Sequence, residues 1–263
     1  MNKTRIEWCD STWNPVTGCL NNCEYCYARR IANRFGKECL HDKNSRNAGI
    51  EVSMSEYYVK PDNPYPSLFK PTFHRYRLDE PVKKTKGQNI FVCSMADLFG
   101  DWVHREWIQT VFKSCAAAPQ HNYLFLTKNP KKYEELDNKD MLSTSDNMWY
   151  GYSVTDNKTR NIFLSAYHKT FVSIEPLHEK LSLELMAAIA FTDWVIIGAE
   201  TGQNKTKIIP KKEWIDEIVG EAKRYGIKVF MKDSLIPIVG EENMLREFPE
   251  EFKKQKLGGL INE

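Results

Sequence analysis

The chain has 263 residues, 41% of them hydrophobic, which is enough for a substantial buried core. Its 37 basic and 35 acidic residues leave a formal net charge of +2, so overall charge alone does not draw the protein onto nucleic acid or a membrane. No apolar run approaches the roughly 20 residues that cross a bilayer, and residues 1–10 are polar and do not resemble a signal peptide. We therefore expect a cytoplasmic protein without a membrane partner; the composition does not specify an oligomeric state.

Near the N-terminus, three of the seven cysteines fall within eight positions. Cys19, Cys23 and Cys26 have the spacing C-x3-C-x2-C, which suits one loop around a metal better than a disulfide framework and indicates a reducing compartment. Thiolates select soft metals and iron-sulfur clusters. Three ligands would leave one iron of a 4Fe-4S cluster open for a bound molecule. A zinc site would need a fourth ligand, for which Cys39 or His41 is available, so zinc stays an alternative.

Residues 36–88 form an irregular excursion that mixes aromatic and basic side chains. Such a mixture supplies the base stacking and phosphate contacts that recognise single strands or flipped bases. It also suits a lid with inward aromatics and solvated lysines, which is the commoner explanation. The side chains concerned are Tyr57, Tyr58, Lys60, Tyr65, Phe69, Lys70, Phe73, Arg75, Tyr76, Arg77, Lys83, Lys84 and Lys86.

From residue 89 onward, runs rich in β-branched and aromatic residues alternate with segments of helical character. The predicted strands are Asn89–Ser94, Tyr123–Thr127, Met148–Thr155, Thr170–Ile174, Trp194–Ala199 and Lys228–Met231. The predicted helices are Arg105–Ala118, Lys131–Asp137, Asn157–Ala166, Ser182–Ala190 and Lys211–Tyr225.

This alternation predicts an α/β fold with a parallel sheet and right-handed crossovers. Six strands plus one ahead of the cysteines favour a partial or closed parallel (β/α) barrel over an open doubly wound sheet, with the cluster loop after the first strand. No repeat or linker indicates a second domain, so we expect a single domain over 1–263 with a loosely held tail at 250–263.

The cysteine spacing, with Tyr25 just before the last cysteine, resembles the motif of the radical SAM superfamily. The resemblance implies a radical SAM barrel whose open iron binds the amino and carboxylate groups of S-adenosylmethionine. Reduction by a flavodoxin- or ferredoxin-like electron donor would then yield a 5'-deoxyadenosyl radical, which abstracts hydrogen from a substrate.

Further blocks are similar to a phage-associated, three-cysteine radical SAM-like family with no settled activity. Many members have a longer insertion between the first two cysteines, and the position of Cys93 is usually Asn. The blocks are residues 6–19, 91–99, 126–128, 171–177 and 194–200.

Polar residues at predicted strand ends are candidate cofactor contacts, because parallel α/β folds bind ligands there. By similarity, Tyr25 would pack near the adenine, while Ser94 and Asp97 would face the methionine amino end. Asp97 is equally suited to capping a following helix. Ser153 and Thr155 are candidates for the ribose or carboxylate.

Glu175 and Glu200 follow apolar strands, where a buried carboxylate needs a cation or a ligand. Lys128 and Lys232 are the available countercharges, and they are also candidates to hold the cofactor carboxylate or a substrate phosphate. The alternative is an internal ion pair. Cys93 is a candidate catalytic residue, because a thiol can donate a hydrogen atom to a carbon radical; a buried small hydrophobe is the commoner role for a lone cysteine.

These observations lead to a radical SAM enzyme acting on a nucleobase, nucleotide or nucleic acid as the first functional hypothesis. One alternative keeps the radical chemistry but assigns a peptide or small metabolite as substrate. The other is a non-catalytic nucleic-acid-binding protein that holds zinc or an iron-sulfur cluster.

Overall fold

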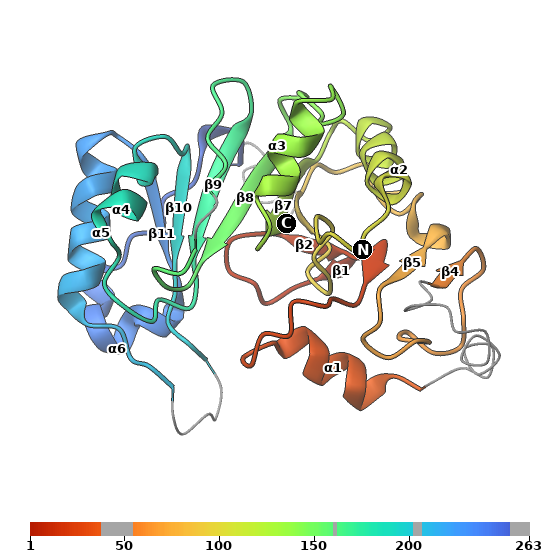
Figure 1. The fold of residues 1–263 in the computed structure, drawn as a ribbon, viewed down its shortest axis with the longest axis horizontal. Coiled ribbons are helices and arrows are strands. Elements are labelled where there is room, and N and C mark those ends of the chain that lie inside the picture. The colour runs from red at the N-terminus through yellow and green to blue at the C-terminus, as the bar shows by residue number, and fades with distance from the viewer. Residues whose placement is uncertain (38–54, 160–161, 202–206, 253–263) are drawn as a thin grey trace. The chain divides into compact units, whose positions relative to one another are not determined.

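The computed structural model describes residues 1–37, 55–159, 162–201 and 207–252 (Figure 1). The chain divides into two compact units. The first contains residues 1–5 and 9–125, and the second contains residues 6–8 and those from 126 onward. These two units do not decide whether the chain folds as one domain or as two. The single domain expected from the sequence stays a prediction.

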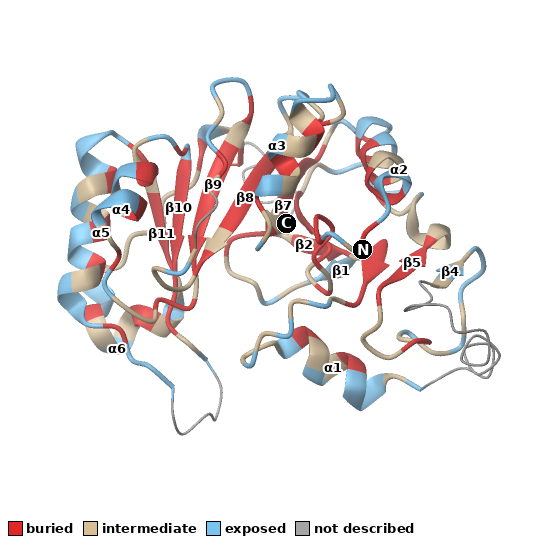
Figure 2. Ribbon diagram, in the orientation of Figure 1, coloured by how far each residue is buried: buried red, intermediate tan, exposed pale blue. Residues whose placement is uncertain are grey.

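The first unit is built on a mostly parallel sheet with the strand order β1-β2-β6-β7. These strands are β1 (Asn2–Lys3), β2 (Ser11–Trp13), β6 (Asn89–Val92) and β7 (Asn122–Thr127). β1 is antiparallel to β2, whereas β2, β6 and the first four residues of β7 run parallel. Every residue of β2 and β6 is buried, as expected for strands covered on both faces (Figure 2).

Two helices accompany this sheet, α1 (Tyr27–Phe35) and α2 (Arg105–Ala116). α2 connects β6 to β7 and buries Trp107, Ile108, Val111, Phe112 and Cys115, which recur at helical spacing. It carries an acidic residue in its first turn and a basic one in its last, which complements the helix dipole.

The predicted irregular excursion contains regular structure in its described part. β4 (Ser55–Tyr57) and β5 (Thr72–His74) join β3 (Val16–Thr17) in a small sheet of order β3-β5-β4, and the short helix η2 (Arg75–Arg77) follows. Strands of two or three residues are too short to show an alternating pattern, so the sequence did not indicate them. Residues 38–54, including Cys39 and His41, lie outside the described residues.

In the second unit, four consecutive strands run parallel in the order β8-β9-β10-β11. They are β8 (Met148–Val154), β9 (Lys169–Ile174), β10 (Trp194–Ile197) and β11 (Lys228–Met231). The helices of this unit are α3 (Lys131–Asp137), α4 (Leu183–Ile189), α5 (Lys212–Arg224) and α6 (Ile236–Val239), with short helices η3 (Asp233–Leu235) and η4 (Glu241–Asn243).

The predicted α/β class and its mostly parallel sheet are confirmed, as are all six strands from residue 89 onward. The described strands show no closed barrel, and closure stays a prediction. None of the described helices has the length and apolar character needed to cross a membrane.

The predicted helix over Asn157–Ala166 is wrong in its described residues, which form turns and irregular chain. Carboxylate side chains accept hydrogen bonds from backbone N–H groups at the start of the predicted helix. Asn157 N–H donates to Glu179 Oε1 at 2.6 Å, and Lys158 N–H donates to Asp156 Oδ1 at 2.9 Å. Short polar side chains that bond nearby backbone groups compete with helix formation in this way.

The first residues of the predicted tail are packed. Phe252 is fully buried, with its ring 4.8 Å from that of Trp149, and Glu251 pairs with Lys169 at 2.6 Å. The remainder of the tail lies outside the described residues.

Candidate functional site

The cysteine loop begins at Gly18, directly after β3, in a backbone conformation that requires glycine. Gly18 has φ = +85°, and a Cβ atom there would lie 2.1 Å from the carbonyl oxygen of Lys70. Its N–H donates to Met95 O at 2.9 Å, and Cys19 N–H donates to Phe69 O at 3.2 Å. The loop is thereby held between residues 69–70 of the excursion and the turn after β6.

The loop ends at Cys26, which is the N-cap of α1. Its Sγ accepts a hydrogen bond from Arg29 N–H at 3.4 Å, and the Cys19 Sγ accepts one from Asn21 N–H at the same distance. Cys19, Cys23 and Cys26 are all half-buried and free of disulfides. Backbone N–H donors to sulfur favour thiolates, and three cysteine sulfurs in one loop are the ligand set of an iron-sulfur cluster, so the donor set fits the group that the motif implies.

The described His, Cys, Asp and Glu residues contain no group of three that could hold a single metal ion. A four-iron cluster attaches each cysteine to a different iron, so this finding concerns a single ion and leaves cluster binding untested. Burial raises the pKa of Cys19 to about 12, against the opposing hydrogen bond from Asn21 N–H.

Asp97 follows β6 and fastens the cysteine loop. Its Oδ2 accepts from Asn21 Nδ2 at 2.9 Å, and its Oδ1 accepts from Phe99 N–H at 3.1 Å. These bonds make it a support of the loop and of its own turn, whereas the predicted alternative, capping of a following helix, does not apply because residues 98–104 contain no helix. Contact with a methionine ammonium stays a prediction.

Ser94 lies in the same turn as Asp97, with partners that the sequence did not single out. Its hydroxyl donates to Asn14 Oδ1 at 3.2 Å, an oxygen that also accepts Met95 N–H at 2.9 Å. Its carbonyl accepts from the hydroxyl of Tyr27 at 2.8 Å. Asn14 lies within residues 6–19, one of the sequence blocks that resemble the phage-associated family. Its place in that block was the feature of the sequence that could have marked it as a site residue.

Cys93 begins this turn in a left-handed conformation, with φ = +59°, and only 2% of its surface is exposed. Its N–H donates to Trp13 O at 2.7 Å. Burial raises the pKa of its thiol to about 12. These features are those of a buried small side chain; hydrogen-atom donation stays a prediction.

In the described part of the excursion, two arginines bind groups of the protein itself. Arg75 pairs with Glu56 at 2.6 Å and Glu106 at 3.1 Å, and Arg77 donates to Asn14 O at 2.8 Å. Phe73 is fully buried. These contacts are typical of a covering segment. Tyr58 is exposed, with the Arg75 guanidinium 5.3 Å from the centre of its ring.

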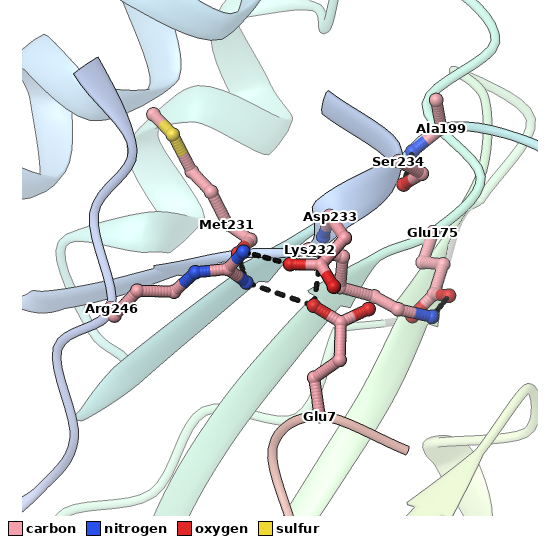
Figure 3. Close-up of polar contacts among 8 residues, drawn as sticks. All are labelled: Glu7, Glu175, Ala199, Met231, Lys232, Asp233, Ser234 and Arg246. Carbon is pink, nitrogen blue, oxygen red and sulfur yellow. Dashed lines mark hydrogen bonds and ion pairs between the residues drawn. The ribbon is translucent and has the colours of Figure 1, made fainter. Parts of the chain in front are cut away.

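In the second unit, charged side chains gather at the carboxyl ends of β9, β10 and β11. Lys232 forms an ion pair with Glu175 (Figure 3). Gly198 leaves room for that pair, because a Cβ there would lie 3.1 Å from Lys232 Cδ and 3.2 Å from Glu175 Cγ. The structure therefore contains the internal ion pair that was one of the two roles foreseen for these residues.

A second charged group beside this pair was not anticipated. Glu7 Oε2 accepts from Asp233 N–H at 2.7 Å and from Arg246 Nη1 at 2.8 Å, and Arg246 also pairs with Asp233 (Figure 3). Ser234 Oγ accepts from Ala199 N–H at 3.0 Å. Residue 7 is 239 positions from Arg246, a separation at which sequence patterns carry no signal.

The remaining candidates of this unit lie at or after the ends of β10, β8 and β7. Glu200 Oε2 is 3.2 Å from His178 Nε2, so its partner is a histidine. Ser153 and Thr155 are half-buried at the end of β8, and Thr155 O accepts from His178 N–H at 3.1 Å. Lys128 is exposed just after β7.

Comparison with known families identifies one that covers nearly all of the chain. Residues 3–242 match the family described as "Protein of unknown function (DUF5131)". The chain belongs to the DUF5131 family. This match does not confirm the resemblance to the phage-associated family, which stays a prediction. Comparison with curated proteins found no match.

Solved structures of spore photoproduct lyase resemble this DUF5131 protein in fold. A mutant of that lyase with serine in place of a cysteine matches with a TM-score of 0.53 at 12% identity, over 88% of this chain and 79% of its own. A second mutant, with phenylalanine in place of a tyrosine, matches with a TM-score of 0.49 at 12% identity, over 82% and 74%. At this identity the first match shows a shared fold alone, and the second carries no argument.

Proposed function

We propose that this protein is a radical SAM enzyme in which Cys19, Cys23 and Cys26 hold a 4Fe-4S cluster. The cluster and bound S-adenosylmethionine would supply a 5'-deoxyadenosyl radical that abstracts a hydrogen atom from the substrate. The observation that carries the proposal is the C-x3-C-x2-C loop between β3 and α1, in which the three cysteines are half-buried and the sulfurs of Cys19 and Cys26 accept backbone N–H donors.

The fold supports this proposal independently of the motif. Spore photoproduct lyase is a radical SAM enzyme, and its serine-for-cysteine mutant shares the fold over most of both chains. The cysteine loop also lies where ligands gather in parallel α/β folds. Gly18 is hydrogen-bonded to Met95, just beyond the carboxyl end of β6.

This chain's own residues would hold the loop and contact the cofactor. Asp97 and Asn21 fix the loop through their hydrogen bond, and Gly18 permits its close approach to residues 69 and 70. Tyr25 and Ser94 are the proposed cofactor contacts in the first unit. The proposals for Lys128, Ser153, Thr155, Glu175, Glu200 and Lys232 concern the second unit.

We further propose a nucleobase, nucleotide or nucleic acid as the substrate. The support is the name of the fold neighbour, spore photoproduct lyase, together with the basic and aromatic excursion. Because Arg75 and Arg77 are engaged internally, phosphate contacts in the excursion would come from other basic residues, such as Lys84 and Lys86, which are exposed.

Anaerobic reconstitution with iron and sulfide tests the cluster. We expect about four irons per chain and a broad visible absorption band. Replacing Cys19, Cys23 and Cys26 together with Ala should abolish both, whereas Cys115→Ala, in the buried face of α2, should retain them. A protein that stays colourless, or carries only zinc, would contradict the proposal.

Reduction in the presence of S-adenosylmethionine tests the radical chemistry. The reconstituted protein should release 5'-deoxyadenosine, and the triple Cys→Ala variant should not. Incubation with deuterated DNA, RNA or nucleotides should then transfer deuterium into 5'-deoxyadenosine. Transfer only from peptides or small metabolites would retain the radical chemistry and overturn the nucleic-acid substrate.

A further inference from the structure

The exposed face of α1 is basic. All charged residues of the helix are arginines, and the exposed residues Tyr27, Arg30 and Arg34 recur at helical spacing. Exposed Lys37 follows the end of the helix, after the extended Gly36. Figure 2 shows that part of the surface of α1 is exposed. The opposite side buries Ala28 and Ala32. We call this surface, made of Tyr27, Arg30, Arg34 and Lys37, the basic face of α1.

The charge on this face is not neutralised within the described chain. Among residues 1–37, 55–159, 162–201 and 207–252, no carboxylate pairs with Arg30, Arg34 or Lys37. Arg29 differs in donating a hydrogen bond to Asn22. The guanidinium groups of Arg29 and Arg34 both lie over aromatic rings, those of Phe69 and Phe35, at 5.6 and 5.2 Å from the ring centres. With a formal net charge of only +2 for the whole protein, the positive charge on α1 is a local concentration.

Apolar side chains of the cysteine loop and of α1 are exposed as well. Leu20, Tyr27 and Phe35 have exposed fractions of 43%, 44% and 55%. Leu20 belongs to the cysteine loop, and Phe35 is the last residue of α1. Protein-binding surfaces combine apolar side chains with charged ones, a composition that this segment matches.

The basic face of α1 is next to the proposed cluster ligands. α1 starts one residue after Cys26, and Arg30 is four residues beyond that cysteine, about 6 Å along the helix axis. A protein bound here would approach the cysteine loop itself. A protein that donates single electrons must bind close to the group that accepts them, here the proposed cluster.

We propose that the basic face of α1, with Leu20 and Phe35, is the docking surface for an acidic one-electron donor protein of the flavodoxin type. The inference rests on the proposed function and names the partner of the same site. With a cluster held by Cys19, Cys23 and Cys26, the donor would lose one electron and the cluster would gain it. No covalent bond forms or breaks in this step.

The observations favour an acidic protein over nucleic acid. Leu20 and Phe35 offer nothing to a phosphodiester backbone, whereas they suit the small, transient interfaces of redox partners. Opposite charges on the two proteins would speed their encounter and make it sensitive to salt. A nucleic acid on this face is an outcome that the following experiment detects.

The test compares the reconstituted protein with Arg30→Glu/Arg34→Glu. The control Lys223→Glu/Arg224→Glu makes the same charge change on exposed residues at the end of α5. Stopped-flow absorbance would follow cluster reduction by reduced flavodoxin, and a separate titration would measure flavodoxin binding. At low salt we expect the α1 variant to lose at least about tenfold in both second-order rate and affinity, and the control about twofold or less.

Dithionite separates docking from damage to the cluster. It is a small reductant that needs no docking surface, so it should reduce all three proteins equally, and their iron content should match. Equal reduction of wild type and α1 variant by flavodoxin would overturn the docking surface and leave the proposed function intact. Loss of oligonucleotide binding alone would reassign the face to nucleic acid, and failure to hold a cluster would remove both proposals.

Discussion

The side-chain amide of Asn21 donates to the carboxylate of Asp97 at 2.9 Å, which ties the cysteine loop to the turn after β6. The two residues are 76 positions apart in the sequence. Since Asp97 also accepts Phe99 N–H, one carboxylate orders both segments. The shape of the loop therefore depends on a residue that is not among the proposed cluster ligands.

Replacing Asp97 should loosen that loop. Asp97→Ala removes both acceptors and should lower the free energy of unfolding by about 1–3 kcal/mol, and the cluster should be lost faster to a chelator. Asp97→Asn keeps one acceptor oxygen and should lie between the alanine variant and wild type. Urea unfolding and iron release to a chelator are the measurements. Exposed Asp146→Ala serves as control, and an Asp97→Ala protein that kept its iron as wild type does would contradict the assigned role.

Two glycines should respond oppositely to alanine. Gly18→Ala places a Cβ against Lys70 O at a positive φ, so we expect a loss of more than about 2 kcal/mol. Gly220→Ala, within α5 and with nothing within 4 Å of the added atom, should gain about 0.5–1 kcal/mol. Urea unfolding of both variants checks this. Equal effects would show that the backbone at Gly18 is not constrained.

Cys93 should be chemically inert in the folded protein and make stability fall at high pH. Burial raises its pKa to about 12, so the folded state binds a proton that the unfolded thiol releases above its ordinary pKa of about 8.5. Its contribution is therefore complete below that pH and declines as pH rises toward 12, by at most about 1.4 kcal/mol per pH unit. Unfolding of wild type and Cys93→Ala across this range measures the difference.

Alkylation provides a second measurement on Cys93. In the cluster-free protein, iodoacetamide should modify Cys23 and Cys26 before Cys93, which mass spectrometry can resolve. Early modification of Cys93 would instead indicate an accessible thiol and strengthen its role as a hydrogen donor. Unchanged product yield in Cys93→Ala would remove that role.

His74 should make the small sheet acid-sensitive. Burial, and secondly the charge of Arg77, lower its pKa to about 3, and its Nε2 lies 2.8 Å from Thr17 Oγ1. The unfolded histidine binds a proton below its ordinary pKa of about 6.5, so this contribution is complete above that pH and is lost as pH falls toward 3. Urea unfolding of wild type and His74→Gln between pH 7 and 4 measures it. The wild type should lose more stability than the variant, and parallel curves would contradict the assignment.

The sequence predicted features that depend on neighbouring residues, but not those that depend on residues far apart in the chain. Buried parallel strands could be predicted because short apolar, β-branched runs such as Trp194–Ile197 are typical of strands covered on both faces. The cysteine loop was readable because its spacing lies within eight residues. The helix predicted over 157–166 failed because Glu179, distant in sequence, accepts the backbone N–H of Asn157.

The residues of the candidate site show the same difference between features that depend on near and on distant residues. Lys232 was foreseen as a countercharge because it follows a predicted strand, as does Glu175. The supporting residues Asn14 and Asn21 were missed, since their value comes from partners about 80 positions away. The φ of +59° at Cys93 gives a backbone reason for the Asn that the resembling family usually has there, because Asn tolerates this conformation better than most residues.

The contact between Glu7 and Arg246 has a consequence for how the protein matures on the ribosome. Arg246 is synthesised 239 residues after Glu7, so this carboxylate must wait without its guanidinium partner until nearly the whole chain has been translated. At roughly 5–20 residues per second the delay is on the order of ten seconds to a minute. For most of that interval β11 itself (Lys228–Met231) has not been translated, and the charged group at its carboxyl end is completed only when Arg246 follows it.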